Sequence, residues 1–560
     1  MIIDLKQDQK IKLKRLFEQK NYSKFENQVE KLGSIEDLPI YLRMGYAGSK
    51  VLNPNSKKDD FLNATIIFEK IYSKDKSNLE ALYNLILSSL KSEICSYVLP
   101  HLLDFYKKNK KDLKIVEGLA RIYFQLDNMD LSVKFFKKLV DSNPISTIDG
   151  GRLTYLASMN YPSNINQKDY YNECIKLGDA FEKYSKFETY VDNTSLNKKA
   201  KIGFLSGDFR DHSVNFFLKD VIEKIDKKKF YIVGLSNLEL KRHHEVITKF
   251  YQNQFDEWHD VIDYNDEKLV DFVRSLNLDI LIDLNGFTFG NRLNIFAARS
   301  AKIQIGWCGY NNSLGIKNMD YIVADKNLIK NSEKNLYCEK IIFLPKIWNA
   351  MSKPDNLPAV NELPFKDNKI FRYGSFNSFK KISEATVKLW SKILKNSNSE
   401  LYLKNSGGYN EEIYDNLIRK FEKQGVDTKK LIFLKKSKNS EFMKDYYKID
   451  LALDTFPYTG VTTSFQAYLM GVPVLTLSGF NFNSRCGESI NINLGLDEFI
   501  AKNYDDYFKK AILFQNREKL SILRSKLRSK VLNSSLFETS EFTKDLSEIF
   551  TNLMKKRNKD

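Results

Sequence analysis

Two stretches of the sequence carry residues suited to holding a phosphate group. The first is DTFPYTGVTTSFQ, in which a Pro/Gly loop after Asp454 leads into Thr462, Thr463 and Ser464. The residues that follow, through Met470, have helical character, so the threonines open a helix. Free amides at a helix N-terminus, aided by the helix dipole and nearby hydroxyls, form an anion site. The alternative is that Thr462 only caps the helix.

The second stretch, FNSFKKI, places Lys380 and Lys381 between the apolar run 370–376 and a helix that begins near Ser383. Cations are unfavourable at a helix start, so these charges indicate a function. A lysine here could neutralise a departing diphosphate if the two loops are neighbours in a sheet. No Asp-x-Asp motif or His/Cys cluster follows a strand, so the sequence predicts no metal and no cofactor. The alternative is that both lysines are solvated charges.

The motif GDFRDHS supplies a third candidate, His212, directly after the run 201–207. An imidazole titrates near neutral pH, so His212 could act as a general base or donate a hydrogen bond to a ligand. The alternative is a capping or packed histidine. The segment 285–292, NGFTFGNR, follows the run 278–284 in the same way.

These loops all follow short apolar runs that indicate buried parallel strands. Such runs at 201–207, 230–236 and 278–284 alternate with helical segments, and a second set lies between 370 and 477. The expected fold is α/β with two Rossmann-like lobes. The predicted domains are helical repeats at 1–150, a helical linker at 151–198, an N-terminal lobe at 199–345, a proline-rich crossover at 346–369, and a C-terminal lobe with C-terminal helices at 370–560.

Before residue 150 the apolar residues recur with a period of 34, which pairs Leu82 with Val116 and Leu85 with Leu119. This is the length of a tetratricopeptide repeat, a helix-turn-helix unit. Each unit buries its apolar face against its neighbours, so a short superhelix with a concave face is expected. The alternative is an ordinary helical bundle with accidental spacing.

Composition excludes several classes of protein. With 42% hydrophobic and 13% aromatic residues in 560, the chain is neither disordered nor a collagen-like fibre. Its 88 Lys+Arg against 71 Asp+Glu give a charge of +17, but the lysines are scattered and form no nucleic-acid-binding block. Five widely spaced cysteines allow no disulfide framework, and no run of 18 apolar residues occurs. A cytoplasmic protein without a membrane span is therefore expected.

Five segments carry a more specific signal: KIGFLSGDFRDHSVNFFL, DLNGFTFGNRLNIFAARSAKIQIGWCGYNNSLG, FNSFKKISEATVKLWSKIL, DLALDTFPYTGVTTSFQAYLMGVPVLTL and SRCGESININLG. In this order, after the repeats, they resemble the catalytic region of the O-linked N-acetylglucosamine transferase family with its SPINDLY-like relatives. The resemblance covers residues from about 200 to 540. It implies a GT-B type, inverting, metal-independent glycosyltransferase that moves a sugar from a nucleotide diphosphate to Ser or Thr of proteins.

The resemblance also assigns roles to residues by motif position. Lys381 matches the family's essential lysine that contacts the donor diphosphate. Thr462 and Thr463 match the threonine pair at the phosphate-binding helix, and Gly460 lies in the same donor-binding loop. His212 matches the active-site histidine of the first lobe, as a base or as a ligand contact.

The chain departs from the family pattern at several positions. Ser378 stands where Gln or Asn is usual and reaches less far. Phe442 replaces a histidine near the nucleotide base, which keeps stacking and loses a polar contact. Gln466 replaces the carboxylate that binds the ribose, which leaves the donor open. The other departures are Asp445 for an arginine, Phe216 for a second histidine, and Asn311 for the proline of a Gly-Tyr-Pro-Gly loop.

The leading hypothesis is therefore protein O-glycosylation from UDP-N-acetylglucosamine or a related nucleotide sugar. The repeats are expected to recruit the polypeptide acceptor, and a second copy of the chain is a further expected partner. One alternative keeps the fold and changes the donor to GDP-fucose, or the acceptor to Asn or a glycan. Another is a repeat scaffold whose transferase region has decayed, which the departures favour and the retained Lys381 and threonine pair oppose.

Overall fold

The computed structural model describes residues 5–142, 151–185, 199–367, 369–406, 408, 410–435, 437 and 439–557. The chain divides into two compact units. The first comprises Met1–Thr147 with Asn410–Leu417, and the second comprises Ile148–Tyr409 with Ile418–Asp560. No helix within the described ranges is long and apolar enough to cross a membrane.

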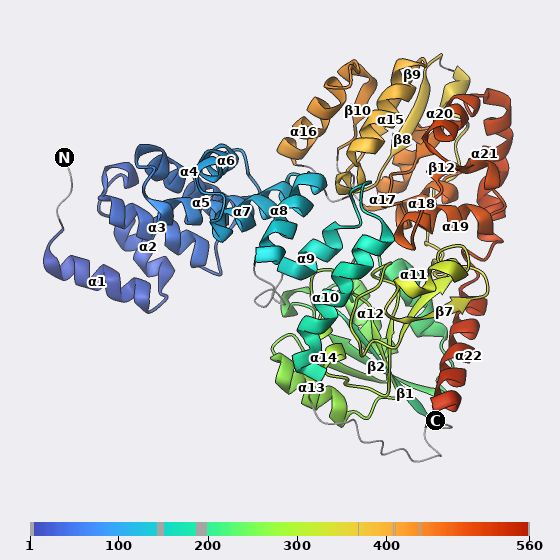
Figure 1. Ribbon diagram of the computed structural model, residues 1–560, viewed down its shortest axis with the longest axis horizontal. Helices are drawn as coiled ribbons and strands as arrows, with labels where there is room; N and C mark the ends of the chain where they lie inside the picture. The colour runs from blue at the N-terminus through green and yellow to red at the C-terminus, as the bar shows by residue number, and fades with distance from the viewer. Residues whose placement is uncertain are drawn as a thin grey trace. The chain divides into compact units, whose positions relative to one another are not determined.

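The N-terminal part of the first unit, residues 5–142, is helical and is drawn in blue in Figure 1. Its helices are α1 (Gln7–Glu18), α2 (Tyr22–Glu30), α3 (Ile40–Leu52), α4 (Lys58–Lys74), α5 (Leu79–Ser92), α6 (Leu99–Lys108), α7 (Leu113–Gln125) and α8 (Met129–Ser142). α5 and α7 begin 34 residues apart, at Leu79 and Leu113. Both are capped at the start, because the side chains of Asn78 and Asp112 accept amide hydrogens of the first turn. α7 packs against α8, and α4 against α5. The predicted helical N-terminal region is confirmed.

The second unit begins with α9 (Gly151–Ser158) and α10 (Gln167–Ser185) and continues into a lobe with a seven-stranded parallel sheet of order β3-β2-β1-β4-β5-β6-β7. The strands are β1 (Ala200–Ser206), β2 (Phe230–Ser236), β3 (Glu257–Asp260), β4 (Ile280–Asp283), β5 (Ile303–Gly306), β6 (Tyr321–Asp325) and β7 (Lys340–Leu344). The helices between them are α11 (Asn215–Lys224), α12 (Val246–Gln254), α13 (Asp266–Ser275) and α14 (Leu293–Ala297). The central strands β1 and β4 are buried along most of their length, which explains their mostly apolar sequences.

The second lobe has a six-stranded parallel sheet of order β10-β9-β8-β11-β12-β13. Its strands are β8 (Phe371–Ser375), β9 (Ser399–Leu403), β10 (Leu431–Phe433), β11 (Leu451–Leu453), β12 (Val474–Leu477) and β13 (Ile500–Ala501). The helices in this part of the chain are α15 (Glu384–Lys395), α16 (Glu411–Glu422), α17 (Asn439–Phe442), α18 (Thr462–Leu469), α19 (Cys486–Asn493), α20 (Tyr504–Leu513), α21 (Arg517–Leu532) and α22 (Thr539–Arg557). The first part of α16 belongs to the first unit, and α22 packs on the first lobe. Two parallel-sheet lobes after a helical region confirm the predicted fold class.

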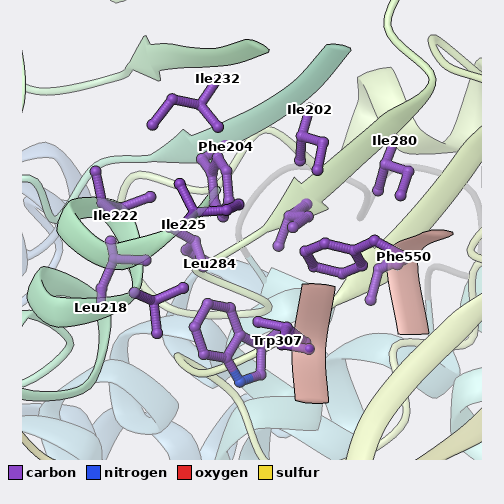
Figure 2. Packing of buried hydrophobic residues seen from close by; sticks show 14 of the residues in the cluster. Ile202, Phe204, Leu218, Ile222, Ile225, Ile232, Ile280, Leu284, Trp307 and Phe550 are labelled. Atoms are coloured by element: carbon purple, nitrogen blue, oxygen red, sulfur yellow. The ribbon is translucent and has the colours of Figure 1, made fainter. Parts of the chain in front are cut away.

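The core of the first lobe includes residues from the last helix of the described chain. Ile202 and Phe204 of β1 pack with Leu218 of α11 and with Trp307, and Phe550 of α22 joins them (Figure 2). All five side chains are at most 2% exposed. The sequence did not predict this placement, because an amphipathic helix shows its apolar face but not the surface that will cover that face.

Candidate active site

The loops that follow β8 and β11 meet, because these strands are neighbours in the second lobe's sheet. The strand order reverses between them, and this is where open parallel sheets bind ligands. Lys381 ends a short 3-10 helix (Phe379–Lys381) in the first of these loops. Its Nζ donates a hydrogen bond to the Thr459 carbonyl oxygen at 2.9 Å and lies 4.1 Å from the centre of the Tyr458 ring. The predicted adjacency of the lysine loop and the threonine loop is confirmed.

The environment of Lys381 weakens its hold on a proton. Burial lowers the pKa of Lys381 to about 8, and the nearby Asp454 carboxylate opposes this shift. Burial likewise raises the pKa of Asp454 to about 6. At pH 7 the pair is therefore an ammonium beside a carboxylate. An anion that binds next to Lys381 favours its protonated form and raises its pKa.

Asp454, which sequence analysis placed only at the end of a strand, organises the loop. Its Oδ1 accepts a hydrogen bond from the Gly460 amide at 2.7 Å, and its Oδ2 accepts one from Thr476 Oγ1 at 2.8 Å. Asn377, also missed, accepts a hydrogen bond on Oδ1 from Thr463 Oγ1 at 2.6 Å. A Cβ on Gly460 would lie 2.8 Å from both Asn377 Oδ1 and Thr463 Oγ1, so only glycine lets these groups meet.

The start of α18 has backbone donors for which the structure gives no acceptor among the described residues. Its N-cap residue, Val461, supplies no side-chain cap, and the amides of Ser464 and Phe465 donate to the Val461 carbonyl. The amides of Thr462 and Thr463 come before these bonds and belong to the unpaired first turn. Thr462 is thus the first helical residue and not the cap, so the capping alternative is wrong. A phosphate here would meet two amides and a positive helix end.

The residues expected at the nucleotide lie on three different elements. Ser378 precedes the 3-10 helix of Lys381, Phe442 ends α17, and Gln466 lies on α18 one turn after the threonine pair. The Phe442 ring has the ammonium of Lys404 4.5 Å from its centre. The structure gives no contact, within the described residues, that joins Phe442 to Gln466 or Ser378.

The replacement at Asp445 has a structural reason. Its Oδ2 pairs with Lys404 Nζ at 2.5 Å, and its Oδ1 pairs with Lys448 Nζ at 2.8 Å. Although burial opposes it, hydrogen bonding to these lysines and to Ser437 lowers the pKa of Asp445. An arginine in this place would repel Lys404, so a carboxylate here fits the lysine beside it.

His212 lies in the first lobe, beyond the carboxyl end of β1. Its Nδ1 is 3.6 Å from Asp208 Oδ2, and its side chain is 34% exposed. Burial lowers the pKa of His212 although Asp208 opposes the shift, so the ring is mostly neutral at pH 7. Asp208 is fixed by Arg210 Nη2 at 2.8 Å and by Asn285 Nδ2 at 2.9 Å. No contact among the described residues joins His212 to Lys381.

The segment predicted to be a linker contributes side chains to both lobes. The Tyr161 ring centre lies 4.9 Å from that of Tyr458, the ring beside Lys381. Gln167 donates to Asn312 Oδ1 of the first lobe at 2.9 Å and accepts from Asn481 Nδ2 of the second lobe at 3.0 Å. Sequence analysis missed these residues, because Asn, Tyr and Pro between two helices are also typical of a loop without function.

Among the described residues, no group of three or more His, Cys, Asp or Glu side chains is placed to hold a metal ion. The predicted independence from metals stays a prediction.

Two parallel-sheet lobes, with a candidate anion site where the strand order of the second lobe reverses, define a protein of the GT-B fold type. The sequence model of glycosyl transferase family 41 matches residues 158–358 and 358–546. The chain therefore belongs to glycosyl transferase family 41.

Individual relatives agree with this membership. The chain is 28% identical over 414 residues to the probable UDP-N-acetylglucosamine–peptide N-acetylglucosaminyltransferase SPINDLY of Solanum lycopersicum, covering 72% of this chain and 44% of the relative. Its counterpart from Eustoma exaltatum is 30% identical over 404 residues, covering 70% and 43%. A solved O-GlcNAc transferase mutant of Thermobaculum terrenum matches with a TM-score of 0.77 and 25% identity over 92% of this chain and 97% of that one. The chain thus spans less than half the length of these curated relatives.

Proposed function

We propose that this protein is an inverting, metal-independent glycosyltransferase that moves N-acetylglucosamine from UDP-N-acetylglucosamine to Ser or Thr of proteins. The observation that carries the proposal is the meeting of the Lys381 ammonium with the loop that opens α18. The names of the relatives, which specify a UDP-N-acetylglucosamine donor and a peptide acceptor, support the donor and acceptor classes.

The chemistry follows from the charge that develops when the donor breaks. An acceptor hydroxyl attacks the anomeric carbon, the bond from that carbon to the diphosphate oxygen breaks, and the nucleotide diphosphate leaves with the extra negative charge. Lys381 and the amides of Thr462 and Thr463 would stabilise this charge. The acceptor proton needs a base, and the mostly neutral ring of His212 could take it or hold the acceptor by a hydrogen bond.

The direct test is mass spectrometry of proteins co-expressed with the wild-type chain and with Lys381→Ala. We expect peptides heavier by one N-acetylhexosamine on Ser or Thr with the wild type only. Unmodified proteins in both cultures, together with a purified chain that hydrolyses no donor, would refute the proposal. Loss of nucleotide binding as well would indicate a repeat scaffold with a decayed transferase region.

A second candidate keeps the site and changes the donor to GDP-fucose. It is favoured by Gln466, which replaces the carboxylate expected at the ribose, and by Phe442, which replaces a histidine at the base. Thermal unfolding with UDP and with GDP separates the two, because a ligand at 100 times its Kd stabilises the folded state by about 2.7 kcal/mol. A deoxyhexose mass on the modified peptides would establish the second candidate.

Binding of UDP is expected to weaken as the pH rises above about 8. Lys381 has a pKa of about 8 in the free protein, and a bound diphosphate favours the ammonium and raises that pKa. Protons are therefore taken up on binding near pH 8, and the affinity falls by up to about tenfold per pH unit above it. Calorimetry in two buffers of different ionisation enthalpy measures this uptake. The variant Lys381→Met should show none, and proton release by the wild type would contradict the assignment.

Replacing Phe442 with alanine is expected to weaken UDP binding about tenfold. A base stacked on an aromatic ring contributes roughly 1–3 kcal/mol, and the ring is held in place by Tyr446 in an edge contact at 6.1 Å between centres. Inorganic pyrophosphate has no base, so its affinity should be the same in both proteins. Equal losses for UDP and pyrophosphate would show that Phe442 supports the loop and does not contact the base.

A further inference from the structure

One partly buried amide beside the candidate active site has a solvent-shielded oxygen without a partner among the described residues. Asn311 lies in the loop after β5, at the position where the resembling family has proline. Its Nδ2 contacts Cys486 Sγ of the second lobe at 3.6 Å. Its Oδ1 is shielded from solvent and accepts no hydrogen bond from any residue that the structure describes. Buried side-chain polar atoms are paired in the large majority of cases, so this oxygen calls for an explanation.

The position of the amide links it to Lys381. Cys486 opens α19, and burial raises the pKa of its thiol while the charge of Lys381 opposes that shift. The next residue, Gly487, donates its amide hydrogen to Thr459 Oγ1 at 3.4 Å, and the Thr459 carbonyl holds Lys381. Asn311 of the first lobe therefore contacts the start of α19, and the same helix start is hydrogen-bonded to the residue that holds Lys381.

The proposed function decides what can meet the amide there. In a nucleotide sugar, the sugar is bonded directly to the phosphate that Lys381 would hold, so the sugar is the donor group nearest to Asn311. Its hydroxyls both donate and accept hydrogen bonds, so they can pair with the unpaired end of an amide in either orientation. A proline in this place could do neither.

We propose that Asn311 determines donor-sugar specificity by hydrogen bonding a hydroxyl of the transferred sugar, an inference that rests on the proposed function. Asn311 then adds to the affinity for the nucleotide sugar and not to that for the nucleotide alone. A site built to hydrogen bond a hydroxyl also rejects an analogue that lacks it, because the amide is again left unpaired.

Calorimetry on the full chain tests this with two pairs of probes: UDP with UDP-N-acetylglucosamine, and GDP with GDP-fucose. The measured quantity is the Kd ratio of nucleotide to nucleotide sugar. We expect Asn311→Ala to lower this ratio about tenfold for the preferred pair, with the nucleotide Kd unchanged. The control, Asn331→Ala, changes an exposed asparagine of the same lobe and should leave both constants unchanged.

The outcomes separate the two proposals. If Asn311→Ala keeps the wild-type ratio, or if the wild type gains no affinity from either sugar, the role of Asn311 is refuted and the nucleotide site stands. If the wild type binds none of the four probes, the proposed function itself fails. Should Asn311→Ala not fold, Asn311→Leu, which has a similar size and no hydrogen-bonding group, replaces it, and an unchanged ratio in that variant again refutes the role.

Discussion

Replacing Lys381 with alanine is expected to lower the rate of sugar transfer by about 100-fold or more. Removal of one group that stabilises developing charge in a water-poor site typically costs a factor of 100 to 1,000 in rate. Lys381 is placed for this role by three contacts: the Thr459 carbonyl at 2.9 Å, the Tyr458 ring at 4.1 Å and the neighbouring Asp454. Its charge is needed most when the diphosphate departs, so turnover should fall more than donor affinity.

Single-turnover kinetics with saturating donor separate the chemical step from binding. The control is Lys388→Ala, which removes an exposed lysine from α15 and should leave the rate unchanged. A Lys381→Ala enzyme with a normal rate and only a raised KM would show that the lysine binds the donor equally in the ground and transition states.

Replacing Arg485 with alanine is expected to destabilise the second unit by about 2–3 kcal/mol, less than the roughly 3–5 kcal/mol typical of a fully buried pair, because 22% of the Glu333 side chain is exposed. Arg485 of the second lobe holds Glu333 of the first lobe through two nitrogens, at 2.5 and 2.8 Å, and only 3% of its side chain is exposed. It also donates to the Leu328 and Gly479 carbonyls. The variant removes the arginine donor from two carbonyls and leaves the Glu333 carboxylate with the Lys330 amide as a donor.

Urea denaturation of wild type and variant measures the loss, and its pH dependence identifies the pair. Burial alone would raise the pKa of Glu333, but Arg485 overcomes this and lowers it. The stabilisation by the pair is therefore complete above the pKa of glutamate in the unfolded chain and is lost as the pH falls through the lower folded value. The two proteins should converge in acid. The control Lys509→Ala breaks an exposed pair with Asp505 and should have little effect. An unchanged urea midpoint for Arg485→Ala would refute the role given to this contact.

The sequence predicted the strands of the two lobes well, because a buried parallel strand is a short unbroken apolar run. The run 201–207 became β1 (Ala200–Ser206), and 278–284 contains β4 (Ile280–Asp283). Helix starts were predictable for a similar reason, since Ser383 caps α15 with its own side chain. The order of strands in each sheet is set by tertiary packing, which periodicity does not encode.

The residues of the candidate site also fall into two groups: those that the sequence pointed to and those that it did not. Lys381 and the threonine pair stand out because a cation before a helix and a Pro/Gly loop into hydroxyls are unusual locally. Asn377, Gln167 and Asn311 did not stand out as contacts to a ligand or to the other lobe. Their partners are distant in sequence: Gln167 and Asn481 are separated by 314 residues. In the sequence, a polar loop residue that faces solvent cannot be distinguished from one that contacts another lobe.

The packing of α22 bears on how the chain folds as it is made. Phe550 belongs to the same core as Ile202 and Phe204 (Figure 2). In addition, Thr539 Oγ1 donates a hydrogen bond to Asp220 at 2.6 Å. A ribosome that has finished β1 must therefore translate the whole second lobe, which takes tens of seconds at about 5–20 residues per second, before the first lobe can close its core. During that time the apolar surface that α22 will cover is open to water and to other chains. The two lobes have separate sheets, but the first lobe can finish folding only after the second has been synthesised.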